Sequence, residues 1–185
     1  MLYFAHAGIA LGVCSAAAGL AQRGGKGNWF AALSRYADVR ILMIGALLPD
    51  IIDKPIGQYL LRDTFSNGRI FSHTLLFCVL LAISGWILLR AKSQYWLLTL
   101  AVGDFIHLLL DQVWRAPKAV LWPFMGFKFA RIDLEGYVGG LWRALTSNPM
   151  VYIPEIIGVS IIVWYLVVVL KRKQAGVLLK TGRIS

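Results

Sequence analysis

Long apolar runs, most of them near the length of a membrane-crossing helix, recur along the chain. They cover Leu2 to Ala21, Phe71 to Leu89, Tyr95 to Asp111 and Val151 to Leu170. A helix needs about 20 mostly apolar residues to cross the hydrocarbon core of a bilayer. A shorter run, Val39 to Asp53, would extend about 22 Å as a helix. The pattern therefore predicts an all-α integral membrane bundle with about five membrane segments.

The composition agrees with that prediction. The 185 residues are 58% hydrophobic and only 15% charged, and a typical soluble domain carries about 25% charged residues. The net charge of +10 does not indicate a nucleic-acid partner, because the lysines and arginines lie in the loops rather than along one basic helix. We expect one membrane domain over residues 1–185. Within it, residues 112–150 form an interfacial segment, since the run Leu121 to Gly126 is too short to cross.

The loop charges indicate an orientation. Alternate loops carry 11 lysines and arginines on the side that includes the carboxy terminus, against 8 on the other side. Cytoplasmic loops are enriched in these residues, so we expect the amino terminus outside and the carboxy terminus in the cytoplasm of a plasma (inner) membrane. The first segment lacks the basic start of a signal peptide, and we expect it to remain as a membrane helix.

Ionisable residues lie near the ends of four of these segments, and the alternating direction of the chain brings them to one membrane level. They are His6 at the start of the first segment, Asp50 and Asp53 at the end of the second, His73 at the start of the third, and His107 and Asp111 at the end of the fourth. Ionisable side chains are costly at membrane depth and usually serve a function there. The sequence therefore predicts one polar site at one end of the bundle.

The spacing and the residue types favour a metal site. Asp50 and Asp53 are three residues apart and His107 and Asp111 are four apart, and both spacings place two side chains on one helix face. Imidazole and carboxylate ligands without thiolate suit zinc, manganese or iron. Cys14 and Cys78 lie in apolar runs without the spacing of a thiolate site. We expect one or two divalent ions, most plausibly zinc, and two ions would share a bridging carboxylate.

Two cations flank the predicted ligands. Lys54 directly follows Asp53, and Arg69 precedes His73 by four residues, so both can bind a substrate phosphate. The alternative is that both simply extend to the membrane interface. Asp104, three residues before His107, is expected either to orient an imidazole or to make a plain polar contact, rather than to bind metal. We expect Asp50, Asp53 and Arg69 to take part in catalysis.

At these residues the chain resembles the YdjM-like (DUF457) family, inner-membrane proteins that are described as metal-dependent hydrolases. The matching pieces follow the family's order and are His6-Ala7, Leu47 to Asp53, Arg69 to Thr74, Gly103 with His107 to Asp111, and Leu121 to Pro123. Many members have a Pro-Asp-x-Asp-His run where this chain has Ile52 and Asp53 in the last two places. A histidine that often precedes the arginine is Gly68 here.

The order of histidines and aspartates is also similar to that of zinc-dependent phospholipase C and P1-type nucleases. This similarity implies one ion held by Asp53, His73, His107 and Asp111, and a second held by His6 and Asp111. Fold analogy alone does not establish a substrate.

From the residues and the resemblance we expect a membrane-bound metal-dependent hydrolase. Its substrate would be a phosphoester of a lipid or lipid-linked molecule, attacked by a metal-activated water. Two other classes stay open: a transporter or channel that uses the same Asp and His cluster, and a membrane scaffold without catalysis. The sequence leaves the substrate and the oligomeric state open.

Overall fold

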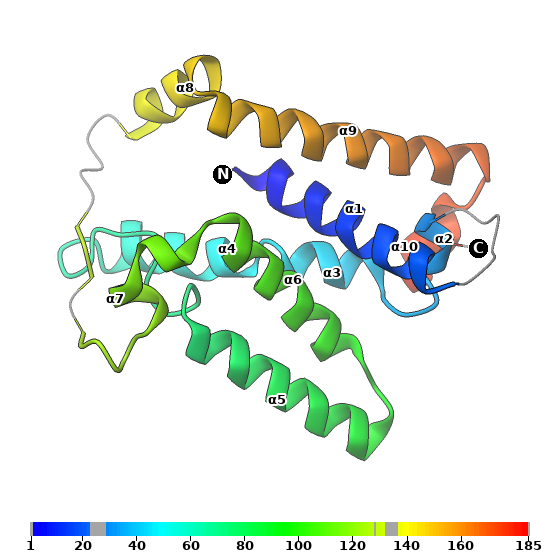
Figure 1. The fold of residues 1–185 in the computed structure, drawn as a ribbon, viewed down its shortest axis with the longest axis horizontal. Helices are drawn as coiled ribbons and strands as arrows, with labels where there is room; N and C mark the ends of the chain where they lie inside the picture. Colours follow the sequence, from blue (N-terminus) through cyan, green and yellow to red (C-terminus); the bar gives the residue numbers. More distant parts are fainter. Residues whose placement is uncertain (1, 23–28, 128, 132–136, 185) are drawn as a thin grey trace.

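The computed structural model describes residues 2–22, 29–127, 129–131 and 137–184, and this part of the chain is helical without any strand. Three helices are long and apolar enough to cross a membrane: α1 (Tyr3–Ala21), α5 (Leu75–Lys92) and α9 (Pro149–Lys171). A fourth apolar helix, α6 (Trp96–Leu110), is shorter, with 15 residues. The predicted all-α membrane bundle is thus confirmed. Its helices are arranged around α1, with α9 on one side and α3 (Val39–Gly45), α4 (Leu48–Lys54) and α6 on the other (Figure 1).

The second apolar segment differs from the single helix that hydropathy predicts. It forms α3 (Val39–Gly45) and α4 (Leu48–Lys54), and a π-helical turn, η1 (Pro55–Leu60), follows. Pro49 lies in the first turn of α4 and has no backbone N–H to continue the helix of α3. The break leaves the carbonyl of Ala46 available to a side chain from α6.

The start of the third segment also differs from the prediction. Helix α5 begins at Leu75 rather than Phe71, because Thr74 caps it by accepting a hydrogen bond from Phe77 N at 3.0 Å. Residues 70–74 form a turn that packs against α4. This turn carries His73 into the interior.

Glycines let pairs of helices approach closely. A Cβ atom on Gly8 of α1 would overlap the backbone of Gly158 of α9, and one on Gly158 would overlap the carbonyl of Phe4. A Cβ atom on Gly45 of α3 would likewise overlap the backbone of Leu100 of α6. Small residues at such crossings are typical of helices packed within membranes.

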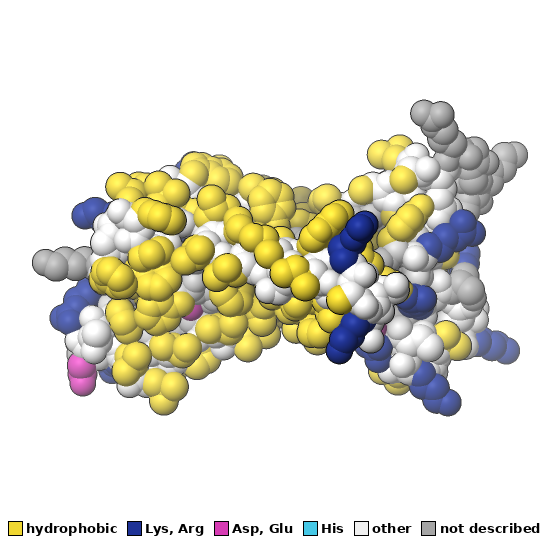
Figure 2. Space-filling view, turned by 90° about the horizontal axis from the view of Figure 1, so that it is seen from below, with side chains coloured by type: hydrophobic (Ala, Val, Ile, Leu, Met, Phe, Trp, Pro, Cys, Tyr) yellow, Lys and Arg dark blue, Asp and Glu magenta, His cyan; other side chains and the backbone are white. Residues whose placement is uncertain are grey.

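The apolar residues divide between a core and an outward surface. The core joins α1, α3 and α9 with α2 (Trp29–Leu33), and its buried residues include Leu11, Phe30, Leu33, Leu42, Tyr165 and Val169. Many other large apolar side chains face outward and form a broad band, while lysines and arginines gather mainly toward the right-hand end of the view (Figure 2). This surface is the one expected for a protein surrounded by lipid.

The remaining helices lie at the two ends of the bundle (Figure 1). At one end are η2 (Val113–Arg115), α7 (Pro117–Val120) and α8 (Tyr137–Ser147), all within the segment 112–150 that was predicted to be interfacial. Residues 128 and 132–136 of that segment lie outside the described part. At the other end are α2 and α10 (Ala175–Thr181).

Candidate metal centre

The structure brings all six predicted ligands together at one end of the bundle. Each side chain is at most 5% exposed, and they come from the start of α1, from α4, from the turn before α5 and from the end of α6. The six are His6, Asp50, Asp53, His73, His107 and Asp111. Four segments that are distant in sequence therefore supply one buried polar cluster.

Asp53 anchors the turn that carries His73. Its Oδ2 atom accepts hydrogen bonds from the backbone N–H groups of Ile70 at 2.8 Å and His73 at 3.1 Å. Its Oδ1 atom accepts from Phe71 N at 3.2 Å, and both oxygens accept from Ser72 N, at 3.0 and 3.1 Å. A fully buried carboxylate with this many donors is held tightly. Asp53 thus builds the turn that presents the histidine.

The same carboxylate fixes the His73 ring. Asp53 Oδ2 lies 2.8 Å from His73 Nδ1. Since a carboxylate only accepts hydrogen bonds, Nδ1 carries the proton, and in the neutral ring Nε2 presents its lone pair. The Ser72 hydroxyl donates to the Pro49 carbonyl at 3.0 Å and ties the turn to the start of α4. The arrangement is the usual way in which a carboxylate orients a histidine that binds metal.

His107 is oriented in the same sense by the backbone. Its Nδ1 atom donates to the Ala46 carbonyl at 2.8 Å, which is the carbonyl at the break between α3 and α4. Its Nε2 atom lies 3.2 Å from Nε2 of His73. In their neutral forms the two rings therefore direct two lone pairs at each other, which is unfavourable unless a proton or a cation lies between or beside them.

His6 completes the group of imidazoles. Its ring stacks on that of His107, with centroids 4.0 Å apart and planes 23° apart, and the residue is 1% exposed. Its Nε2 atom lies 3.2 Å from Asp111 Oδ1, but without hydrogen-bond geometry. Within the described residues neither ring nitrogen of His6 has a hydrogen-bond partner. A buried imidazole in this state is available as a ligand.

The donor atoms form two overlapping groups that could each hold a metal ion. One is Asp50, His73 and His107, and the other is His6, His107 and Asp111, with the donor atoms of each group within 4.8 Å of one another. His73 Nε2 also lies 3.6 Å from Asp50 Oδ1 and 3.8 Å from Asp111 Oδ2. Ligand atoms on a tetrahedral zinc ion are about 3.3 Å apart, so small movements would complete such a site. These residues fit a divalent metal with nitrogen and oxygen ligands.

Both carboxylates of these groups are paired with a cation. Lys54 Nζ lies 2.6 Å from Asp50 Oδ2 and 4.4 Å from the centre of the Tyr3 ring. A guanidinium nitrogen of Arg69 lies 2.7 Å from Asp111 Oδ2, and the Arg69 side chain is 43% exposed. The two flanking cations predicted from the sequence therefore contact the cluster directly. Arg69 also reaches the surface of the protein.

Two further acids, Glu155 and Asp104, are buried in the bundle, and the sequence does not predict their contacts. Glu155 of α9 accepts hydrogen bonds from Leu2 N at 2.6 Å and Ala5 N at 3.2 Å, and it thereby caps the start of α1 beside His6. Asp104 is fully buried, and in the described part of the chain neither of its oxygens has a hydrogen-bond partner, although the Cys78 thiol faces it. Of the two roles left open for Asp104, the orienting one is wrong: Asp53 and Ala46 hold the rings of His73 and His107, and Asp104 bonds to no described imidazole.

A bundle of apolar helices with a buried cluster of histidine and aspartate at one end defines a helical membrane protein with a candidate metal centre. A family model described as "YdjM inner membrane protein" matches residues 1–176, and the chain belongs to this family. No curated protein and no solved structure gives a significant match. The wider resemblance to phospholipase C and P1-type nucleases thus gains no support from these comparisons.

Proposed function

We propose that the protein is a membrane-bound, metal-dependent hydrolase that acts on a phosphoester of a lipid or lipid-linked molecule. The observation that carries this proposal is the 3.2 Å approach of His73 Nε2 and His107 Nε2 while both Nδ1 atoms are held by oxygen acceptors. Buried nitrogens arranged in this way are suited to a shared cation. In a site at the end of a bundle, hydrolysis is the chemistry that such a cation best serves.

The residues divide into ligands and a positioning residue. His73, His107 and Asp50 would hold the first ion, most plausibly zinc, with manganese or iron as the alternatives. Asp53 has its oxygens engaged by the backbone of residues 70–73, so we assign it to positioning rather than to direct ligation or catalysis. A bound divalent ion supplies an activated water at neutral pH and stabilises charge on a phosphoryl oxygen.

The number of ions depends on His107 and Asp111. Because His107 Nδ1 is engaged by Ala46, only its Nε2 atom can bind metal, and it can serve one ion. Asp111 directs Oδ1 toward His6, at 3.2 Å, and Oδ2 toward His73 and His107, at 3.8 and 3.9 Å. Its carboxylate is therefore the group that would bridge to a second ion beside His6. We propose one ion as the minimum and Asp111 as the bridge if there are two.

Lys54 and Arg69 are proposed to bind the phosphate of the substrate. Each now neutralises a carboxylate of the cluster, at 2.6 and 2.7 Å. When those carboxylates bind metal, the cations no longer have to balance their charge and can turn to an anion. The planar guanidinium of Arg69 suits two phosphate oxygens at once.

The setting of the site favours a lipid-linked substrate. Large apolar side chains near the cluster are exposed, namely Tyr3, Phe4, Ile51 and Leu75. They belong to the same ends of α1, α4 and α5 that supply the ligands. A substrate whose tail stays in the bilayer would reach the cluster from this side. With the charge bias of the loops, we propose that this end faces away from the cytoplasm.

The test is metal analysis combined with hydrolysis. Purified wild type should contain about one or two equivalents of metal and release product from one member of a panel of phospholipids and polyprenyl phosphates. The double variant His107→Ala plus Asp111→Ala should lose both properties. Asp63→Ala, an exposed loop carboxylate outside the cluster, is the matched control and should keep them.

The two rival classes predict different results. Metal flux into proteoliposomes that depends on Asp50, without hydrolysis, would indicate a transporter. Strong thermal destabilisation by a chelator, without any hydrolysis, would indicate a structural metal in a scaffold. Unchanged metal content in the double variant would contradict the proposed centre altogether.

A further inference from the structure

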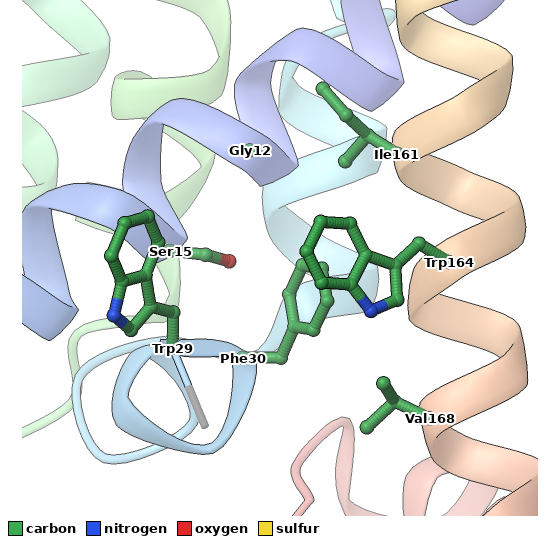
Figure 3. Close-up of a pocket in the computed structure, with 7 residues that line it drawn as sticks. All are labelled: Gly12, Ser15, Trp29, Phe30, Ile161, Trp164 and Val168. Atoms are coloured by element: carbon green, nitrogen blue, oxygen red, sulfur yellow. The ribbon is translucent and has the colours of Figure 1, made fainter. Parts of the chain in front are cut away.

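A second site lies on the other face of α1, between α1, α2 and α9. It is a cavity of about 450 Å³, within the range of about 300 to 1,000 Å³ that is usual for small-ligand sites. Its lining residues are Gly12, Ser15, Trp29, Phe30, Ile161, Trp164 and Val168 (Figure 3). Apart from Ser15, every lining side chain is apolar or aromatic.

The cavity is separate from the metal centre. Ser15 follows His6 by nine residues on the same helix. At about 3.6 residues per turn, the two side chains point to opposite faces of α1 and lie about 13 Å apart along its axis. A ligand in the cavity therefore does not contact the metal ligands.

Ser15 supplies an unused hydrogen-bond donor at the cavity. The residue is 2% exposed, its hydroxyl has no hydrogen-bond partner among the described residues, and it points into the space beside Phe30 and Trp164 (Figure 3). Other helical hydroxyls of this chain donate to the carbonyl four residues earlier, as those of Thr99 and Ser160 do, at 3.1 and 2.7 Å. Leaving a buried hydroxyl unpaired is costly. The orphaned group indicates a ligand with an acceptor oxygen.

The position of the cavity selects a ligand from the bilayer. Two of its walls, α1 and α9, are membrane-spanning helices. At its rim the indole rings of Trp29 and Trp164 are 54% and 67% exposed. An opening at this level faces hydrocarbon, so an apolar chain is the natural occupant. The acceptor oxygen must then belong to the same molecule.

Charge near the end of the cavity identifies the head group. Gly12 meets Ile161, which places Ser15 approximately level with Trp164 on the neighbouring α9. From there α9 runs for about two turns to Lys171, and Lys173 follows; both lysines are exposed. Exposed lysines at the end of a membrane helix attract anionic head groups. The distance suits a glycerophospholipid, whose ester carbonyls lie a short way below its phosphate.

We propose that this cavity binds one anionic glycerophospholipid. An acyl chain fills the space between Ile161 and Phe30, an ester carbonyl accepts the hydrogen bond of Ser15, and the phosphate lies near Lys171 and Lys173. The site holds its lipid independently of hydrolysis at the metal centre, and it does not rest on the proposed function.

The test is native mass spectrometry of the full-length protein in mild detergent, titrated with phosphatidylglycerol or phosphatidylcholine. The wild-type protein should retain phosphatidylglycerol in preference to phosphatidylcholine. Ser15→Leu, which fills the cavity, should weaken retention at least tenfold. Val13→Leu adds bulk on an exposed face of the same helix and should leave retention unchanged. Equal retention by these two variants would show that only surface lipid is bound and would overturn the proposal.

Two further variants separate the parts of the ligand and do not depend on filling the cavity. Ser15→Ala should weaken the binding of phosphatidylglycerol about three- to tenfold, as expected for the loss of one hydrogen bond. It should no longer distinguish the diester lipid from its diether analogue, which lacks the carbonyl. Lys171→Gln plus Lys173→Gln should abolish the preference over phosphatidylcholine. If Ser15→Ala still prefers the diester as strongly as wild type does, the assigned hydrogen bond is wrong.

Discussion

The Nε2 atoms of His73 and His107 lie 3.2 Å apart, and each ring is held from behind by an oxygen acceptor at its Nδ1 atom. Neither ring can change its tautomer without losing a buried hydrogen bond at 2.8 Å. In their neutral forms the two Nε2 atoms face each other with their lone pairs, and this is the arrangement expected of two metal ligands.

Asp53 and Asp104 are both fully buried, but they should respond in opposite ways to replacement by asparagine. Asp53→Asn replaces one of the two accepting oxygens by an NH2 group, which cannot accept the hydrogen bonds that residues 70–73 donate there, and it should cost at least about 2 kcal/mol of stability. Asp104→Asn removes a carboxylate that has no hydrogen bond, and it should be neutral or stabilising. Thermal unfolding in detergent measures both. A larger loss for Asp104→Asn than for Asp53→Asn would contradict the assigned roles.

The positioning role of Asp53 also predicts a change in metal affinity. Without its carboxylate the His73 ring loses its fixed tautomer, and the affinity for zinc should fall about 10- to 100-fold. Competition with a chromogenic chelator gives the dissociation constant. Asp104→Asn, which leaves the two imidazoles held by Asp53 and Ala46, should keep the wild-type affinity. An unaltered affinity in Asp53→Asn would mean that the carboxylate does not orient the ligand.

Arg69 should matter for anions and not for the metal. Arg69→Gln removes a partly exposed guanidinium that contacts Asp111 at 2.7 Å, while the nitrogen ligands stay in place. The metal content should therefore match wild type, and binding of inorganic phosphate to the metal-loaded protein should weaken at least tenfold by calorimetry. Arg62→Gln, in the exposed loop before it, is the control. Loss of metal in Arg69→Gln would show instead that the arginine supports the ligands.

The glycine contact between α1 and α9 should couple helix packing to the site. Gly158→Ala places a methyl group on the carbonyl of Phe4, two residues before His6, and should cost about 1 to 3 kcal/mol and reduce metal content. Gly139→Ala in α8 meets nothing within 4 Å and should be neutral or slightly stabilising. Thermal unfolding and metal analysis of the two variants decide the matter. Equal behaviour would mean that α1 does not need its close approach to α9.

The sequence predicts the membrane helices and the gathering of polar residues because both depend on local patterns. Apolar runs define α1, α5, α6 and α9 within a few residues at most of their boundaries. The alternating direction of the chain is sufficient to predict that the three histidines meet, as their ring contacts show.

The rest depends on contacts that no local pattern records. The break between α3 and α4 follows from Pro49. The carbonyl of Ala46 that the break leaves available holds His107, and these two residues are 61 positions apart in the sequence. The hydrogen bond from Ala5 to Glu155 spans 150 residues. The spacing of Asp53 from Asp50 predicts a ligand, whereas the backbone of residues 70–73 engages its carboxylate.

His73 and His107 are proposed to bind a metal ion through their Nε2 atoms. X-ray absorption at the metal edge of the purified protein tests this most directly. We expect a shell of nitrogen and oxygen atoms at about 2.0 to 2.2 Å from the metal, with the scattering pattern of at least two imidazoles and no sulfur. The pattern should lose imidazole scattering in His73→Ala. A sulfur shell, a spectrum without imidazole, or the same spectrum in His73→Ala would contradict it.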